Sequence, residues 1–388
     1  MSGGGALRNF SGVALGDRPG SFDIELRGEK IASITPSAGD APAEWLVLPA
    51  FVNFHTHANR SFAAPSRRPV SLADAVAASK FERAAASVDD VCARAGRLLQ
   101  RAVAHGTALI RTHTDVDAAT GMRDIEGVLG AAAGVADAID VEIVAFANAA
   151  ADPARVETRE LLAEALRKGA TLLGAVPAMY ERPLASAEAL LDLAADLGVQ
   201  VDVHLDEHLD AAAIVLEQVV DASMERGLEG RVAISHGCVL SVLQDAAVAR
   251  ILDKMAAARI KLVVQPALNL YLQDRGDRSP RRRGLAPVQE ALRAGVEVRF
   301  GSDNVRDWFF PWGDADPLDE AYVGALAAHI DAPEPLLAAV CGGRSGLRAG
   351  ERADLVLIPA RSFDDALARR PGGRLLVRRG RLVPPRPR

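Results

Sequence analysis

Five positions carry side chains of the kinds that bind metals or transfer protons. His55 and His57 are two residues apart, so on a strand both imidazoles point to the same side. His204 is a third imidazole, and the carboxylate of Glu207 follows it. Asp303 comes directly after an apolar segment. Three imidazole nitrogens and one carboxylate oxygen suit one divalent metal such as zinc or iron.

A metal held by His55, His57, His204 and Asp303 would keep an open position for water, which is typical of catalytic sites. A divalent metal lowers the pKa of bound water from about 16 to about 7. Asp303 could accept a proton from that water, and Glu207 could carry protons to a substrate. We therefore expect metal-dependent hydrolysis.

Each of these residues also has an ordinary structural explanation. Histidines at a strand end can simply make hydrogen bonds, and His236, after Ser235, can be a core histidine. Asp206, Glu207 and Asp303 can cap the helices that follow them. Their joint occurrence favours chemistry if the strand ends meet in one place, where His236 would stabilise developing charge.

The elements that must position these residues are short apolar runs that alternate with longer stretches of helical period. Eight such runs occur, at 46–57, 107–116, 141–148, 172–179, 199–207, 232–237, 261–269 and 296–303. Eight βα units predict an α/β fold, a (β/α)8 TIM barrel, and a doubly wound sheet is the competing layout. The unusual polar residues fall at the C-terminal ends of the runs, where barrel active sites lie, which favours the barrel.

The two ends of the chain have a different texture, with short alternating segments separated by Gly and Pro that are typical of antiparallel strands. We expect residues 1–48 and 340–388 to pair into one small, discontinuous β domain. Residues 49–339 would form the catalytic barrel.

Composition excludes several classes of partner. The 388 residues include 45 Lys and Arg against 51 Asp and Glu, and the only notable basic run is Arg281–Arg283. Nucleic acid and membrane are therefore not expected partners, and no apolar run approaches the roughly 18 residues of a membrane span. Three separated cysteines and the lack of a signal-like N-terminus indicate a cytoplasmic protein.

The motifs taken together resemble the amidohydrolase superfamily, and within it the cytosine deaminase-like branch, which includes isopropylammelide aminohydrolases. The resemblance covers nearly the whole chain and rests on six segments: Pro49–His57, Arg111–Val116, Ile143–Phe146, Asp202–Glu207, Ser235-His236 and Ser302–Asn304. It implies a barrel with a small β domain from both termini, a metal on the four ligands named above, and acid/base and transition-state roles for Glu207 and His236. Binuclear relatives have a bridging Lys or Glu near the fourth strand, and segment 173–179 has neither, which indicates a single metal.

The same resemblance suggests which residues contact the substrate. Asn148 stands where cytosine deaminases carry a glutamine, and Asn304 stands where they carry a second aspartate. Trp308 belongs to an aromatic cluster that we expect to wall the pocket, and His113 is near the site by its strand position. Arg281–Arg283 are expected to form a solvated loop.

These features predict a mononuclear metal-dependent deaminase of a small nitrogen heterocycle of the cytosine, isocytosine or aminotriazine type. Hydrolysis of a cyclic amide or of an N-alkylamino ring is the alternative within enzymes. A metal-binding scaffold without catalysis is the hypothesis from another class. The partner is a small molecule, and relatives of this kind are often homo-oligomers.

Overall fold

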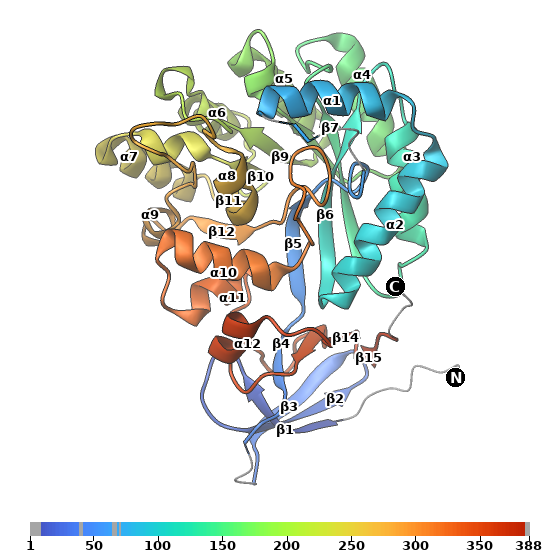
Figure 1. Cartoon of the computed structure of the whole chain (residues 1–388), viewed down its shortest axis with the longest axis vertical. Coiled ribbons are helices and arrows are strands. Elements are labelled where there is room, and N and C mark those ends of the chain that lie inside the picture. Colours follow the sequence, from blue (N-terminus) through green and yellow to red (C-terminus); the bar gives the residue numbers. More distant parts are fainter. Residues whose placement is uncertain (1–8, 39–41, 64–67, 70, 385–388) are drawn as a thin grey trace.

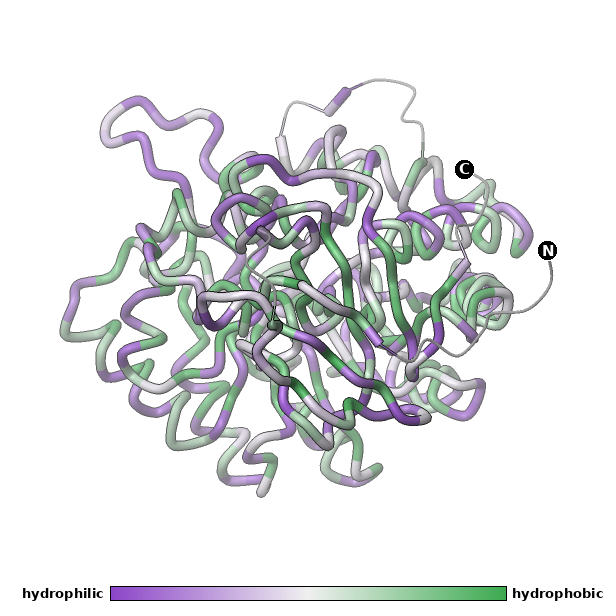
Figure 2. The backbone as a smooth tube through the Cα atoms, turned by 90° about the horizontal axis from the view of Figure 1, so that it is seen from below, coloured by the Kyte–Doolittle hydropathy of each residue, from purple (hydrophilic) through white to green (hydrophobic). Residues whose placement is uncertain are grey.

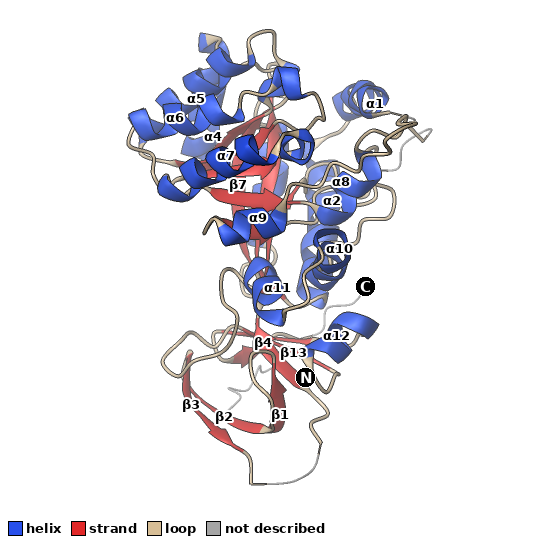
Figure 3. Ribbon diagram, turned by 90° about the vertical axis from the view of Figure 1, so that its left-hand side faces the viewer, coloured by secondary structure: helices blue, strands red, loops and turns tan. Residues whose placement is uncertain are grey.

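The structure is a computed structural model that describes residues 9–38, 42–63, 68–69 and 71–384. Within these ranges the chain forms an eight-stranded sheet and a separate seven-stranded sheet. Figures 1 and 3 show the seven-stranded sheet at one end of the molecule and helix α1 (Leu72–Ala84) at the other.

The eight-stranded sheet is parallel throughout and rolls into a barrel. Its strands, in order around the barrel, are β5 (Phe51–Thr56), β6 (Thr107–Val116), β7 (Asp140–Ala147), β8 (Leu172–Ala175), β9 (Gln200–Leu205), β10 (Val232–His236), β11 (Lys261–Val264) and β12 (Glu297–Phe300). The last strand returns to the first, where the Asp303 amide donates to the His55 carbonyl oxygen at 2.8 Å. The predicted TIM barrel with a small β domain is confirmed, and the doubly wound sheet is excluded.

Most of the helices cover the outside of the barrel, whereas α1 lies across the end farther from the seven-stranded sheet and the last helix lies beside that sheet, as Figure 1 shows. After α1 they are α2 (Val88–Ala104), α3 (Arg123–Ala133), α4 (Val156–Lys168), α5 (Pro183–Leu197), α6 (Leu216–Glu225), α7 (Asp245–Ala257), α8 (Pro266–Leu272), α9 (Val288–Arg293), α10 (Pro317–Ala328), α11 (Pro333–Val340) and α12 (Phe363–Arg369). Helix α2 shows why they form: Ser87 and Asp90 make a reciprocal capping box at its start, and Val91, Leu98 and Leu99 are buried on one face.

The main hydrophobic core lies between the strands and these helices. Strands covered on both faces need apolar residues on both, which explains the near-continuous apolar runs in the sequence. Figure 2 shows hydrophobic segments gathered toward the middle of the molecule and hydrophilic ones in the outer loops. None of the helices in the described ranges is long and apolar enough to cross a bilayer.

The seven-stranded sheet combines strands from the early and late parts of the chain, in the order β15-β14-β13-β4-β1-β2-β3. They are β1 (Asn9–Leu15), β2 (Phe22–Arg27), β3 (Lys30–Pro36), β4 (Leu46–Pro49), β13 (Leu355–Ile358), β14 (Leu375–Arg378) and β15 (Arg381–Leu382). The run at 46–57, which we expected to be one strand, is therefore shared between both sheets. Strand β4 ends at Pro49 and β5 begins at Phe51. The exact domain limits stay a prediction.

A buried carboxyl group on α10 makes the stability of this fold depend on pH. Glu320 is 5% exposed, and its carboxyl accepts a hydrogen bond from the Ala267 amide at 3.1 Å. Burial raises the pKa of Glu320 to about 8. The folded protein therefore keeps a proton that the unfolded chain releases near pH 4.5, and stability falls as pH rises between these values.

We expect Glu320→Gln to flatten the decline in unfolding free energy between pH 5 and pH 8, because glutamine has no proton to lose. The wild-type slope from this group reaches at most about 1.4 kcal/mol per pH unit. Chemical denaturation across that range measures it, with Glu334→Gln at an exposed position on α11 as the matched control. Equal slopes for wild type and Glu320→Gln would contradict the assignment.

Candidate metal centre and active site

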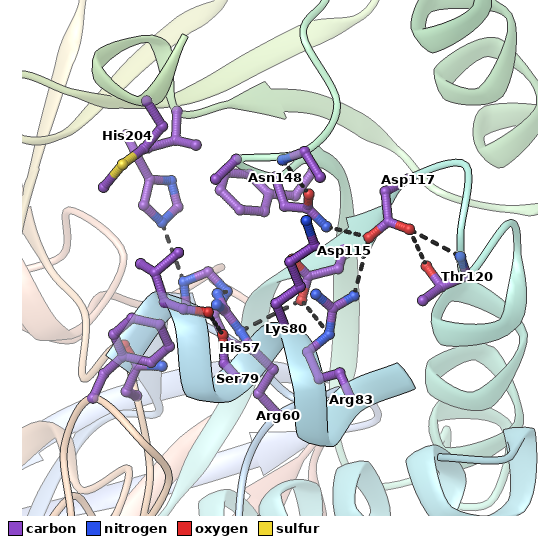
Figure 4. A pocket seen from close by; sticks show the side chains of 18 of the residues that line it. His57, Arg60, Ser79, Lys80, Arg83, Asp115, Asp117, Thr120, Asn148 and His204 are labelled. Carbon is purple, nitrogen blue, oxygen red and sulfur yellow. Dashed lines mark hydrogen bonds and ion pairs between the residues drawn. The ribbon is translucent and has the colours of Figure 1, made fainter. Parts of the chain in front are cut away.

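A cavity of about 400 Å³ opens at the C-terminal ends of the barrel strands. At its inner end it is lined by His57, His204, Glu207 and Asp303. Figure 4 shows side chains from several strands and from α1 converging on this space. The strand-end residues singled out in the sequence therefore come together, as barrel geometry requires.

The four expected metal ligands meet at this inner end. The Nε2 atoms of His57 and His204 lie 3.1 Å apart. The Asp303 carboxylate reaches both histidines of the first strand, with Oδ1 3.3 Å from His57 Nε2 and Oδ2 3.6 Å from His55 Nε2. All four residues are at most 5% exposed.

Several polar atoms here have no hydrogen-bond partner, although burial makes an unpaired polar atom costly. His55 Nε2 and both carboxylate oxygens of Asp303 are buried and make no hydrogen bond with the part of the chain that the structure describes. Burial lowers the pKa of His55, His57 and His204 well below the ordinary value, so the rings are neutral and their nitrogens offer lone pairs. Lone pairs and a carboxylate facing one space fit a divalent cation.

A series of hydrogen bonds to the Nδ1 side of the ring fixes the orientation of His55. Asp202 is fully buried, and although burial opposes its ionisation, His113 and Arg111 hold its pKa well below the ordinary value. Its carboxylate accepts the Ser235 hydroxyl at 2.7 Å. Having given its only proton away, the Ser235 oxygen can only accept from His55 Nδ1, 2.9 Å away. His55 Nε2 is therefore the free acceptor that faces Asp303.

Glu207 and His236 lie at the edge of this cluster. His236 Nε2 is 3.7 Å from a Glu207 oxygen and 3.6 Å from Asp303 Oδ2. Burial raises the pKa of Glu207 to about 7, so its carboxyl group can hold or release a proton near neutral pH. Burial lowers the pKa of His236 to about 3, and the Asn269 amide nitrogen lies 3.1 Å from its Nδ1. Glu207 can therefore carry a proton, while the imidazole ring of His236 stays neutral.

The backbone at these strand ends is unusual. Asp206, His236 and Asp303 all have positive φ, at 49°, 74° and 58°. Residues other than glycine rarely adopt this conformation, and it costs about 1–3 kcal/mol where the surroundings impose it. For Asp206 the turn lets a carboxylate oxygen cap α6, accepting from the Leu216 amide at 2.8 Å. For His236 and Asp303 it turns the side chains toward the cluster.

The four residues expected to contact substrate are placed differently from one another. Asn148 and Asn304 line the cavity, but each amide already donates within the protein, to Asp117 at 2.6 Å and to Asp307 at 2.6 Å. His113 and Trp308 are not among the lining residues.

His113 lies beneath the metal cluster, fully buried, with Nε2 3.3 Å from Asp202. Trp308 packs in a separate apolar cluster with Leu268 and Phe310, while its neighbour Phe309 reaches the cavity. Arg282 donates a hydrogen bond to the Asp277 carboxylate and lines a different pocket on the surface.

Sequence reasoning missed the opposite wall of the cavity. That wall comes from α1 and from ion-paired residues, namely Arg60, Ser79, Lys80, Arg83 and Asp117. Arg60 lies only three residues after His57, a proximity that could have been noticed. The α1 residues gave no usable signal, because a mixed face on a helix resembles a solvated surface.

Comparison with known proteins agrees with this geometry. The sequence signature of the amidohydrolase family matches residues 157–384. A pterin deaminase from Rhizobium rhizogenes is 32% identical over 387 residues, which cover 93% of this chain and 87% of the relative. The chain belongs to the amidohydrolase family. As in that family, divalent metal binding is expected at the His and Asp cluster of this amidohydrolase.

Two further relatives extend along nearly the full amidohydrolase chain. The N-isopropylammelide isopropyl amidohydrolase of Pseudomonas sp. is 26% identical over 95% of both chains. The crystal structure of 5-methylcytosine deaminase from Klebsiella pneumoniae, liganded with 5-fluorocytosine, superposes with a TM-score of 0.89 at 26% identity and covers 98% of both chains. The match to the cytosine deaminase-like branch is thus confirmed.

The hydrogen bonds from His55 through Ser235 to Asp202 lead to a prediction about metal affinity. In Ser235→Ala the histidine loses the acceptor for its Nδ1 proton, and we expect zinc affinity to fall about 10-fold or more. Competition with a chromophoric chelator measures the zinc Kd without any substrate. Ser223→Ala is the matched control, because Ser223 is equally buried on α6 and donates to Val220 instead. If Ser235→Ala binds zinc with the wild-type Kd, the Ser235 hydrogen bond does not orient His55 for metal binding.

Proposed function

We propose that this amidohydrolase removes an exocyclic amine from a small nitrogen heterocycle by hydrolysis and releases ammonia. One observation carries the proposal. Glu207, whose pKa of about 7 lets it exchange protons near neutral pH, opens into the same cavity as the His and Asp cluster. The pterin, cytosine and ammelide enzymes among its relatives support a ring-shaped substrate.

In the proposed site His55, His57, His204 and Asp303 hold one divalent metal, either zinc or iron, since both suit three imidazoles and a carboxylate. When bound, such a metal supplies a Lewis acid that brings the pKa of water near neutrality, to about 7. Asp303, buried and close to three imidazoles, takes the proton that the attacking water loses.

The remaining steps use Glu207 and His236. A C–O bond forms at the carbon that bears the amine, while Glu207 protonates the adjacent ring nitrogen. His236, between Glu207 and Asp303, donates toward the developing charge. The C–N bond then breaks and the amine leaves as ammonia with the proton held by Asp303. The new hydroxyl group returns its proton to Glu207, so the ring keeps the oxygen as a carbonyl and both carboxyl groups regain their starting states.

Removal of an N-alkyl amine is the second candidate. It is favoured by the 26% identity to the N-isopropylammelide enzyme over 95% of both chains. Since the same steps would expel an alkylamine, a substrate panel must contain both free-amine and alkylamino rings.

Ammonia release from aminated pyrimidines, pterins and triazines tests the proposal on zinc- and iron-loaded protein. We expect at least one free-amine ring to react, and Glu207→Gln to lower its kcat about 100-fold or more while metal content stays unchanged. Glu225→Gln, at an exposed position at the end of α6, is the matched control. Release of alkylamines alone would favour the second candidate. Full activity of Glu207→Gln would show that Glu207 does not transfer the proton.

A further inference from the structure

Helix α1 forms the outer wall of the cavity and is anchored there by apolar contacts. Ala75 packs in a cluster with Leu268, Leu272 and Phe309. The cavity-lining residues of α1 recur at helical spacing and so share one face of the helix: Val76, Ser79, Lys80, Arg83 and Ala84. Figure 4 shows Ser79, Lys80 and Arg83 on this face.

Most charges near this wall are already paired. Three carboxylates and three guanidinium groups form one network, made of Asp115, Asp117, Asp124, Arg60, Arg83 and Arg123. Arg83 contacts all three carboxylates at 3.1–3.5 Å. Although burial opposes ionisation of Asp115, Arg60 and Arg83 hold its pKa below the ordinary value. The formal charges of the network therefore cancel.

Lys80 is a cation on this wall that does not belong to the network. It lines the cavity and is exposed to solvent, and it takes part in no ion pair among the residues that the structure describes. Arg83, one turn further along α1, is by contrast fully engaged. The ammonium group of Lys80 is thus available to a ligand in the cavity.

The two ends of the cavity carry different groups. Glu207 and Asp303 place carboxyl groups at the inner end, while Lys80 places a cation at the outer end. Apolar side chains, including Val176 and Met179, lie along the walls. A flat ring whose reacting carbon lies at the inner end can extend an acidic substituent toward Lys80, and attraction between the two charges would orient the ring in the cavity.

We propose that the outer end of the cavity is a subsite for an anionic substituent, such as a carboxylate, on the heterocyclic substrate, and that Lys80 binds this group. The inference rests on the proposed function, because it concerns the substrate of the same cavity. It goes beyond that function by naming a property of the substrate and the residue that selects it.

Equilibrium binding tests the subsite without requiring turnover. Calorimetric titration of the zinc-loaded protein compares deaminated rings with and without a carboxylate: uracil against orotate, and lumazine against lumazine-6-carboxylate. We expect the carboxylated member of the better-binding pair to bind at least about 5-fold more tightly, and Lys80→Met to abolish this ratio. Lys80→Glu should reverse it. Lys30→Met, an exposed lysine on β3 of the other sheet, is the matched control and should keep the wild-type ratio.

The outcomes separate the two proposals. A carboxylate preference that disappears in Lys80→Met supports the subsite even if no ring is deaminated, in which case only the proposed function fails. Equal affinities within both pairs, a ratio unchanged in Lys80→Met, or no binding of any ring would overturn the subsite even if ammonia release is observed.

Discussion

Closure of the barrel between its first and last strands is the constraint on which the site depends. The Asp303 amide donates to the His55 carbonyl, and the Asn53 side chain bridges to Ser302 through both its oxygen and its nitrogen. Gly301 is required at this seam, since a Cβ there would lie 2.4 Å from the Cβ of His55. The closure brings an aspartate within 3.6 Å of histidines nearly 250 positions earlier in the chain. Without it the ligands would have no common centre.

Buried charge is handled in two contrasting ways around that seam. Asp202 and Asp115 are compensated by cationic partners, which keep their pKa values low. Asp303 and Glu207 lack such direct compensation, and burial raises the pKa of both. The first pair stabilises the frame, because ionised and paired groups hold their neighbours in place. Glu207, with a pKa of about 7, remains free to exchange protons near neutral pH, which a hydrolytic site needs.

The sequence predicted the fold well because eight apolar runs alternate with stretches of helical period, and the polar residues at the ends of the runs favoured a barrel over a doubly wound sheet. His55, His204 and Asp303 interrupt apolar runs, and each does so at a C-terminal end. The division of the run 46–57 between two sheets was not predictable, because β4 and β5 are both buried strands with similar composition. Contacts to substrate were harder still. Asn148 and Asn304 line the cavity, and their contact with substrate stays a prediction, while their hydrogen bonds to aspartates depend on loops whose course no periodicity reveals.

The seven-stranded sheet also determines the order in which the molecule can be completed during synthesis. Strand β4 pairs with β13 from Leu46 to Pro49, so its partner is made some 300 residues later. A growing chain must carry the barrel strands and their helices while this edge of β4 has no partner. Contacts of such long sequence separation slow folding and leave strand edges open to other chains. Strands β13, β14 and β15 therefore complete this sheet, because β13 covers the open edge of β4 and β14 and β15 extend the sheet beyond it.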